Sequence, residues 1–348
     1  MILDELDFQL VNALQIAPRA PWATLAPALR TDASTLSRRW ARLTEAGIAW
    51  TTCYVLPQRM QAYSALGERL RSSYASIEIR CEAGRRAEVI DALARKPEVI
   101  NIECTSGSRD LSLNVASAAP GEIDDYVDTQ IAPLPGVIST NTRFVRIMYR
   151  EGSEYDLNAL RPAQRVGVDE IRRTESSVVE SAEPSSLNAS VIAALQPDVR
   201  RPASEVADIV GISVPLARRA ISRLMHSDWV RMRADFAHEV VGWNASVNLW
   251  VTVPQDALER LATGLALLPS VRLCASTIGP ANLVTSLWLR ELEELDEIEL
   301  HIRRLAPEAR VVDRWMVTRV VKRMGTLFDD AGRRRGYVPV PLPSIGTS

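Results

Sequence analysis

The feature that most constrains the fold of this 348-residue chain is an internal repeat. Leu14-Gln15 recurs as Leu195-Gln196, 181 residues later, and seven positions keep that offset. Self-similarity at a fixed spacing indicates a repeated structural unit. Gly107 recurs as Gly279 with a shorter offset of 172, so the sequence predicts a tandem duplication of a two-domain unit. The other matched pairs are Arg19 and Arg200, Ala26 and Ala207, Arg38 and Arg219, Arg42 and Arg223, and Leu43 and Leu224.

Residues 31 to 48 have the pattern of a short amphipathic helix. Asp32 can accept hydrogen bonds from the free N–H groups at a helix start, and Gly47 can end a helix. Leu36, Trp40 and Leu43 fall on one face and leave hydroxyl and guanidinium groups on the others. Such groups can reach phosphates and base edges in a DNA major groove. The sequence therefore favours a recognition helix, with an ordinary solvated helix as the alternative.

Two further helices are expected before it. Apolar residues recur at three- and four-residue steps from Leu3 to Leu14, which predicts a helix that ends before Pro18. A second helix should begin at Pro21, although Pro27 removes one of its hydrogen bonds. Three helices within fifty residues, the last two joined by a tight turn, predict a helix-turn-helix.

The hydrophobic period changes to two at Ser76, where apolar and polar residues begin to alternate. From there to Met148 the order is strand, helix, strand, strand, helix, strand, and the same order returns between Val247 and Val321. This is the ferredoxin-like pattern. The expected fold class is α+β, with two helix-turn-helix (winged-helix-like) domains alternating with two ferredoxin-like βαββαβ domains. The expected ranges are helix-turn-helix domains at 1–50 and 183–233, ferredoxin-like domains at 76–150 and 244–324, linkers at 51–75 and 151–182, and a solvated tail at 325–348.

The charge balance limits how nucleic acid could be bound. The formal net charge is −2, so binding by overall charge is excluded and any contact must be local. The first fifty residues carry five arginines and five acids, yet three of those arginines lie between Arg38 and Arg42. The basic groups are therefore segregated onto one short segment. In the tail, Arg333-Arg334-Arg335 could add a weak phosphate contact.

The cysteines and the first residues favour a cytoplasmic protein. The four cysteines are widely separated and form no C-x-x-C pair, a spacing that fits neither a disulfide scaffold nor a zinc site. The start of the chain carries acids where a signal peptide needs bases, and no apolar run approaches the length of a membrane span. We therefore expect no membrane association.

Several motifs resemble the Lrp/AsnC, or feast/famine, transcriptional regulators, in a double-length form. They are Leu3-Asp4-x-x-Asp7, Leu14-Gln15-x-x-Pro18-Arg19, Leu25-Ala26, Thr35-Leu36-x-Arg38-Arg39 and Leu43-x-x-x-Gly47-Ile48. The resemblance implies a regulator that binds double-stranded DNA, forms homo-oligomers, and binds an amino acid or related effector between ferredoxin-like domains. One chain would supply both halves of a pseudo-dimer, whose two helices meet half-sites about one helical turn apart. The DNA-binding residues so implied are Thr35, Ser37, Arg38, Arg39, Arg42, Ser213, Arg218, Arg219 and Arg223.

The two expected recognition helices differ. Ser213 should cap the second helix better than Asp32 caps the first, with Pro215 harmless in the first turn. The second helix keeps its arginines but has no hydroxyl in place of Thr35. It is therefore expected to contact phosphates while the first helix reads bases. On this hypothesis, removing Arg38 relaxes sequence preference more than removing Arg223.

The resemblance also places effector-binding residues in the loop between the second and third strands of each ferredoxin-like domain. In the first copy these are Gly107 and Asp110, whose carboxylate could hold an ammonium group. In the second copy they are Gly279 and Asn282, an amide that would hold an ammonium less well. The alternative is a plain hairpin in which the Asp serves turn geometry.

No catalytic, metal or cofactor motif stands out, so neither enzyme activity nor a cofactor is expected. The three histidines lack the spacing of a metal site, and Trp22, Trp40, Trp250 and Trp288 fall in patterns typical of core residues. One alternative remains, because siroheme decarboxylases resemble the same two-domain unit. His238 with Gly242-Trp243-Asn244-Ala245 and Trp250 is similar to the region in which those enzymes present a histidine, but the first copy offers no matching histidine.

Overall fold

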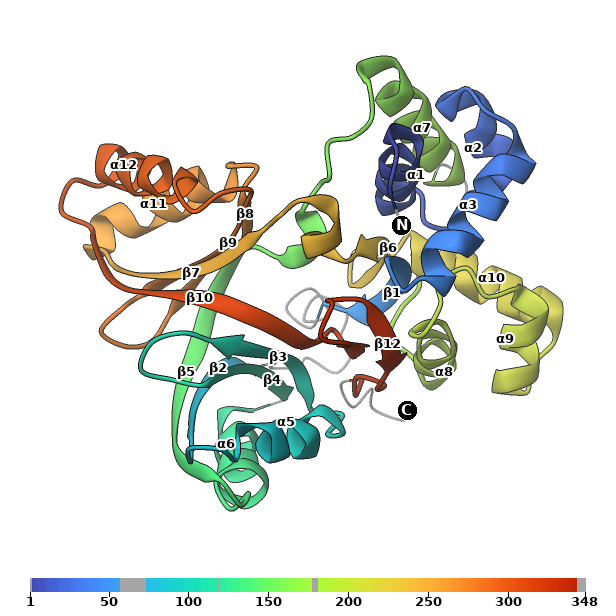
Figure 1. The fold of residues 1–348 in the computed structure, drawn as a ribbon. Coiled ribbons are helices and arrows are strands. Elements are labelled where there is room, and N and C mark those ends of the chain that lie inside the picture. The colour runs from blue at the N-terminus through green and yellow to red at the C-terminus, as the bar shows by residue number, and fades with distance from the viewer. Residues whose placement is uncertain (1, 57–72, 118, 177–180, 343–348) are drawn as a thin grey trace. The chain divides into compact units, whose positions relative to one another are not determined.

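A computed structural model of the chain describes residues 2–56, 73–117, 119–176 and 181–342 (Figure 1). The chain divides into two compact units. The helical unit comprises Met1–Ser72, Asp156–Ala237 and Arg333–Ser348, and the sheet unit comprises Ser73–Tyr155 and His238–Gly332. Each unit therefore draws on both halves of the sequence.

The first three helices of the helical unit begin and end close to where the sequence predicts. They are α1 (Glu5–Ile16), α2 (Trp22–Leu29) and α3 (Ala33–Glu45). Asp4 caps α1, because its Oδ1 accepts a hydrogen bond from the Asp7 N–H at 3.0 Å and Asp7 Oδ2 accepts one from the Asp4 N–H at 3.2 Å. Asp32 caps α3 by accepting from the Thr35 N–H at 2.7 Å. Pro27 lies inside α2, and Gly47 ends α3 with a φ of 66°.

The second copy repeats this order with α8 (Ser186–Leu195), α9 (Ala203–Val210) and α10 (Val214–Met225). The prediction that Ser213 caps better than Asp32 was wrong, because the Ser213 side chain accepts no capping hydrogen bond. Pro215 explains part of this difference. It is the second residue of α10, and a proline has no N–H to donate to the cap.

The two copies are joined by an antiparallel pair of strands, β1 (Ala49–Val55) and β6 (Val230–Phe236), which Figure 1 shows side by side. Thr52 lies opposite Arg233, and the pairing extends three residues in each direction from that point. The strand that follows each recognition helix therefore pairs with its counterpart, so β1 is not the strand of a local wing. The linker expected at 51–75 was wrong for its first residues, and residues 57–72 lie outside the described ones. The β-branched and aromatic residues of β1 favour a strand.

Two arginines brace the joined copies in a reciprocal way. Arg19 donates hydrogen bonds to the carbonyl oxygens of Val199 and, at 3.1 Å, of Arg201. Arg200, at the same position of the repeat, donates to the carbonyl oxygens of Pro18 at 2.8 Å and Ala20 at 3.1 Å. Like the β1–β6 register, these contacts are therefore reciprocal between the two copies.

The linker expected at 151–182 was also wrong in its middle, because it contains helix α7 (Pro162–Ser176). Val168 is fully buried, and a Cβ added at Gly167 would lie 3.2 Å from the Ala28 Cβ on α2. An ion pair of 3.3 Å between Arg165 and Asp169 spans one turn of the helix. The helix thus packs on the first copy rather than only connecting the two, and charged residues hid its apolar face.

The sheet unit contains the predicted ferredoxin-like order twice. The first copy has β2 (Ser73–Cys81), α5 (Arg86–Ala94), β3 (Val99–Thr105), β4 (Leu111–Ser117), α6 (Pro120–Tyr126) and β5 (Val137–Arg150). The second has β7 (Ala245–Thr252), α11 (Gln255–Ala266), β8 (Val271–Thr277), β9 (Leu283–Leu289), α12 (Glu294–Leu305) and β10 (Arg310–Arg323). The α+β class and the order of elements are therefore as expected.

The long last strand of each copy is shared with the other copy. Val137–Phe144 of β5 pairs with β2, and Val145–Arg150 continues onto β8. Likewise Arg310–Val317 of β10 pairs with β7, and Val317–Lys322 continues onto β3. The sheet consequently closes on itself in the order β10-β3-β4-β2-β5-β8-β9-β7, with β7 returning to β10.

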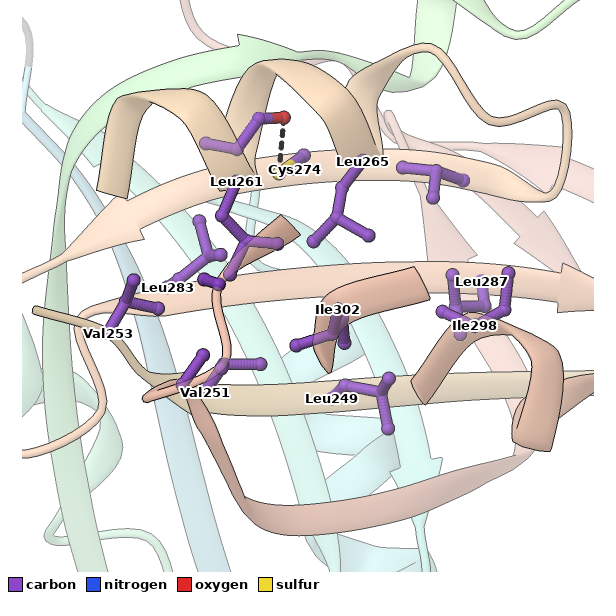
Figure 2. Packing of buried hydrophobic residues seen from close by; sticks show 14 of the residues in the cluster. Leu249, Val251, Val253, Leu261, Leu265, Cys274, Leu283, Leu287, Ile298 and Ile302 are labelled. Atoms are coloured by element: carbon purple, nitrogen blue, oxygen red, sulfur yellow. Dashed lines mark hydrogen bonds between the residues drawn. The ribbon is translucent and has the colours of Figure 1, made fainter. Parts of the chain in front are cut away.

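The core of the second copy lies between its helices and its sheet (Figure 2). Leu261 and Leu265 of α11 and Ile302 of α12 pack against β7 and β9. Buried Cys274 donates a weak hydrogen bond from Sγ to the Ala262 carbonyl oxygen at 3.6 Å. A matching core in the first copy contains Ile77, Leu93 and Leu113. Within the described residues, no helix is both long and apolar enough to cross a bilayer.

The solvated tail expected at 325–348 was wrong over much of its length. Residues Thr326–Phe328 form β11, which pairs with the end of β10. Arg334–Tyr337 form β12, and the Arg334 N–H donates to the Gly47 carbonyl oxygen at 2.8 Å. Pro339 and Pro341 follow these strands, and residues 343–348 lie outside the described part.

Candidate nucleic-acid interface and ligand site

The exposed face of α3 holds fewer free polar groups than the sequence suggests. Thr35 donates its hydroxyl to Asp32 Oδ2 at 2.8 Å and so belongs to the helix cap. Ser37 and Arg38 are exposed, and within the described residues no carboxylate pairs with Arg38. The three hydrogen bonds that Asp32 accepts hold its pKa far below the ordinary value. Because no described carboxylate pairs with Arg38, its guanidinium is the one on α3 that is most available to a ligand such as DNA.

Arg39 and Arg42 are instead clamped to α1. Arg39 Nη1 lies 2.7 Å from Asp4 Oδ1 and 2.9 Å from Asp7 Oδ1, and Arg42 Nη2 lies 2.7 Å from Asp7 Oδ2. The Asp7 side chain is only 1% exposed. The hydrogen bond from Arg39 lowers the pKa of Asp4. These two arginines thus fix the orientation of α3 on α1, a role that the spacing of basic residues alone did not reveal.

The second recognition helix lacks this clamp. At the positions of Asp4, Asp7 and Arg39, the second copy has Ser185, Asn188 and Ala220. Arg218, Arg219 and Arg223 are all exposed on α10. No described carboxylate pairs with Arg218 or Arg219, so α10 carries more uncompensated charge than α3.

The predicted effector loops are tied to the sheet in the same way in both copies. Gly107 and Gly279 adopt φ values of 92° and 146°, as their turns require. Asp110 Oδ2 accepts from the Cys81 N–H at 2.8 Å, and Asn282 Oδ1 accepts from the Val253 N–H, also at 2.8 Å. Each side chain therefore ties its hairpin to the end of a neighbouring strand, β2 in the first copy and β7 in the second. This supports a structural role for Asp110 and Asn282, and effector binding by the four residues stays a prediction.

A charged cluster next to the first loop escaped the sequence reasoning. Buried Arg109 forms ion pairs with Glu78 at 3.2 Å and Asp313 at 2.5 Å, and its guanidinium lies 3.7 Å from the centre of the Trp315 ring. Trp250 contacts Trp315 edge-on, with ring centres 5.6 Å apart. Glu78 occupies an ordinary polar position in the alternation of β2, so the sequence carries no signal for this cluster. The cluster joins the two copies through β2, β7 and β10.

A second buried cluster surrounds His238. Its ring stacks on Trp288 with centres 4.6 Å apart, and its Nδ1 accepts from Arg323 Nη2 at 3.1 Å. Burial, with the charges of Arg323 and Arg272, lowers the pKa of His238 well below its ordinary value. Burial also raises the pKa of nearby Glu103, against the effect of the same two arginines. The ring is therefore neutral at pH 7, in a part of the core where two arginines lie near it.

Comparison with known domains identifies two parts of the first half. Residues 3–44 match the AsnC-type helix-turn-helix domain, and residues 74–153 match the Lrp/AsnC ligand binding domain. The first half of the chain therefore carries both domains of the Lrp/AsnC regulators. The resemblance that the sequence motifs suggested is thereby confirmed, in a chain about twice as long as its relatives of that family.

Individual relatives agree with this assignment. The HTH-type transcriptional regulator FL11 of Pyrococcus horikoshii is 27% identical over 152 residues, which cover 44% of this chain and 95% of that protein. FL11 of Pyrococcus furiosus is 26% identical, covering 44% of this chain and 95% of the relative. Among solved structures, the siroheme decarboxylase NirDL has a TM-score of 0.57 at 16% identity, covering 94% of this chain and 96% of its own. That similarity shows a shared fold over nearly the whole chain.

Proposed function

We propose that this protein is a DNA-binding transcriptional regulator that carries two helix-turn-helix domains, with recognition helices α3 and α10, on one polypeptide. The AsnC-type helix-turn-helix and the regulators similar to the first half support DNA binding as its activity. The match of residues 74–153 to the Lrp/AsnC ligand binding domain supports control by an amino acid or related small molecule. Chains would associate further as homo-oligomers, as the Lrp/AsnC resemblance implies.

One observation carries the proposal. The β1–β6 pairing and the reciprocal Arg19 and Arg200 contacts relate α3 to α10 by pseudo-two-fold symmetry within a single chain. Helix-turn-helix dimers use such symmetry to place two recognition helices in successive major-groove segments. The arrangement supplies in one polypeptide what shorter proteins obtain by pairing two chains.

Selection of genomic DNA fragments by the purified full-length protein tests the proposal. We expect a small set of enriched fragments, whose binding weakens as salt rises because neutralised phosphates release counterions. The double variant R38A/R219A should lose the enrichment, because it removes one guanidinium without a described carboxylate partner from each recognition helix. Enrichment should also change when amino acids are added. The absence of any enriched fragment at low salt would contradict the proposal.

A second candidate function, tetrapyrrole chemistry similar to that of siroheme decarboxylases, is favoured by the cluster around His238. Arg272 and Arg323 are cations that could pair with the carboxylates of a tetrapyrrole, and His238 offers a neutral imidazole. Similarity to a NirDL complex with an iron-uroporphyrin III analogue extends over 92% of this chain, with a TM-score of 0.55. A Soret band shift on mixing with iron-uroporphyrin III, lost in H238A, would support this candidate. An unshifted spectrum would exclude it.

A further inference from the structure

The helical unit contains a pocket that neither the recognition helices nor the effector loops explain. Its volume is 490 Å³, within the range of small-molecule sites in proteins. Trp22, Trp40 and Trp50 come from the first copy, Arg200 and Arg201 precede α9 of the second copy, and Arg334 belongs to β12. Three segments distant in sequence thus meet at one hollow beside α3.

The aromatic part of the pocket offers flat apolar surfaces. Trp40 and Trp50 are 8% and 2% exposed, so they are held by the core. Trp22 is partly exposed, and the Arg200 guanidinium lies 3.7 Å from the centre of its ring. A planar ring could pack against these indoles with the offset or edge-on geometry that aromatic pairs prefer.

The polar part of the pocket has an excess of positive charge. Arg334 Nη2 donates to the Pro197 carbonyl oxygen at 2.9 Å, and no described carboxylate forms an ion pair with Arg334. Its burial lowers its pKa, and the charge of Asp198 opposes that effect. Asp198 Oδ1 is already engaged by the Thr51 hydroxyl and the Arg200 N–H, both at 2.8 Å. A partly buried guanidinium with one neutral partner favours an anion.

The second copy shows that this lining is not needed for the fold. At the positions of Trp22, Trp40 and Trp50 it has Ala203, Ile221 and Arg231, yet α9, α10 and β6 form normally. Three tryptophans around one hollow are therefore specific to the first copy. A purely structural requirement would be expected to act on both copies.

We propose that this pocket binds a planar aromatic carboxylate, with the ring against Trp22 and Trp40 and the carboxylate on Arg334. Arg334 can present a planar fork of N–H donors to the carboxylate in a bidentate pair. Ser37 and Thr44 of α3 also line the pocket. A bound ligand would therefore contact the recognition helix itself and alter DNA affinity, and DNA would reciprocally alter ligand affinity.

Calorimetric titration of the full-length protein tests the proposal without DNA, so its outcome is separate from that of the proposed function. The probes are indole-3-acetate and 2-naphthoate, with indole-3-acetamide and 2-naphthamide as neutral counterparts. We expect at least one acid to bind at one site per chain and its amide to bind at least about tenfold more weakly, since each tenfold corresponds to about 1.4 kcal/mol.

Variants locate the site. R334Q and W22L should each weaken binding of the acid about tenfold or more. R335Q, which removes the exposed neighbouring arginine, is the matched control and should bind as the wild type does. Thermal unfolding followed by circular dichroism checks that each variant folds. If R334Q unfolds, R334K takes its place and should weaken binding because Lys lacks the planar fork.

Three results would overturn the proposal. One is the absence of binding by both acids at millimolar concentration. Another is equal binding of acids, amides and inorganic phosphate, because the pocket would then recognise neither the ring nor the charge. The third is an R334Q variant that loses DNA binding while acid binding is unchanged, which would make Arg334 a phosphate contact. Tenfold discrimination between acid and amide that disappears in R334Q would establish the site.

Discussion

The two helix-turn-helix copies have the same helices but hold their recognition helices in different ways. In the first copy, α3 is capped by Asp32 and clamped through Arg39 and Arg42 to acids of α1. In the second, α10 has no side-chain cap and its register positions for the clamp are Ser185, Asn188 and Ala220. The first helix is thus oriented by ion pairs as well as by its apolar face, whereas the second lacks three of the residues that form this clamp.

This difference separates two uses of arginine that look alike in sequence. Arg39 and Arg42 form ion pairs with acids of α1. In contrast, the described residues include no carboxylate partner of Arg38, Arg218 or Arg219. A fixed helix with one available guanidinium suits base reading, which needs precise geometry. A helix with several available guanidiniums suits phosphate contacts, which tolerate less precise placement.

The largest effect is expected from removing the acid at the centre of the clamp. D7N should lower the free energy of unfolding of the helical unit by about 2 kcal/mol, because Asp7 is buried while its arginine partners are partly exposed. The matched change N188A in the second copy should cost less than about 1 kcal/mol. Urea denaturation measures both. Equal losses would show that the clamp does not distinguish the copies.

Next in size is the effect on DNA recognition. R38A should lower discrimination between the preferred fragment and a single-base variant by about 1–2 kcal/mol, the lower part of the range for a lost base contact. R219A, at the same register of α10, should weaken all fragments similarly and reduce the slope of affinity against salt. R223A is expected to behave like R219A. Fluorescence anisotropy at several salt concentrations measures the affinity for each fragment and the slope of affinity against salt. A uniform loss from all three variants would remove the assigned division of roles.

A smaller effect is expected from the helix caps. D32A should destabilise the first turn of α3 and speed amide exchange there, because the Thr35 N–H loses its acceptor. S213A should change stability by less than about 0.3 kcal/mol, since the Ser213 side chain accepts no capping hydrogen bond. Amide hydrogen exchange resolves the two helix starts within one molecule. Faster exchange at α10 in S213A would contradict the difference.

The smallest effect is a pH dependence confined to the first copy. The pKa of Asp4 is lowered from an ordinary value of 3.8 by its hydrogen bond with Arg39. The carboxylate therefore stabilises the fold above about pH 4, and this contribution disappears as pH falls through the lowered pKa. The change should be under about 1 kcal/mol because the pair is largely exposed. Unfolding between pH 2 and 5 should show it in the wild type and not in D4N.

The sequence predicted the elements but not their partners. Periodicity and capping located α1, α3 and both ferredoxin-like orders, because these signals are local. The pairing of β1 with β6 could not be predicted in this way, because pairing between residues such as Thr52 and Arg233 depends on the whole fold. Helix α7 was predicted to be a linker, because its many charged residues obscured the apolar face that contains buried Val168.

The sequence likewise predicted residues of the candidate site but not the contacts between them. The exposed arginines could be named from their spacing, but the pairing of Arg39 and Arg42 with α1 depends on how the helices pack. The Arg109 ion pairs with Glu78 and Asp313 join three separate elements and leave no sequence motif. The tryptophan pocket likewise depends on Arg334, which the sequence placed in a solvated tail.

The central claim is that one chain binds DNA with two recognition helices that have different roles, base reading by α3 and phosphate contact by α10. The most direct measurement is selection of the full-length protein against randomised duplex DNA, followed by the information content at each position. We predict two half-sites about 10 base pairs apart, one well defined and one degenerate, with R38A making the well-defined half-site degenerate. A single half-site, or two half-sites of equal definition that R38A affects equally, would contradict the claim.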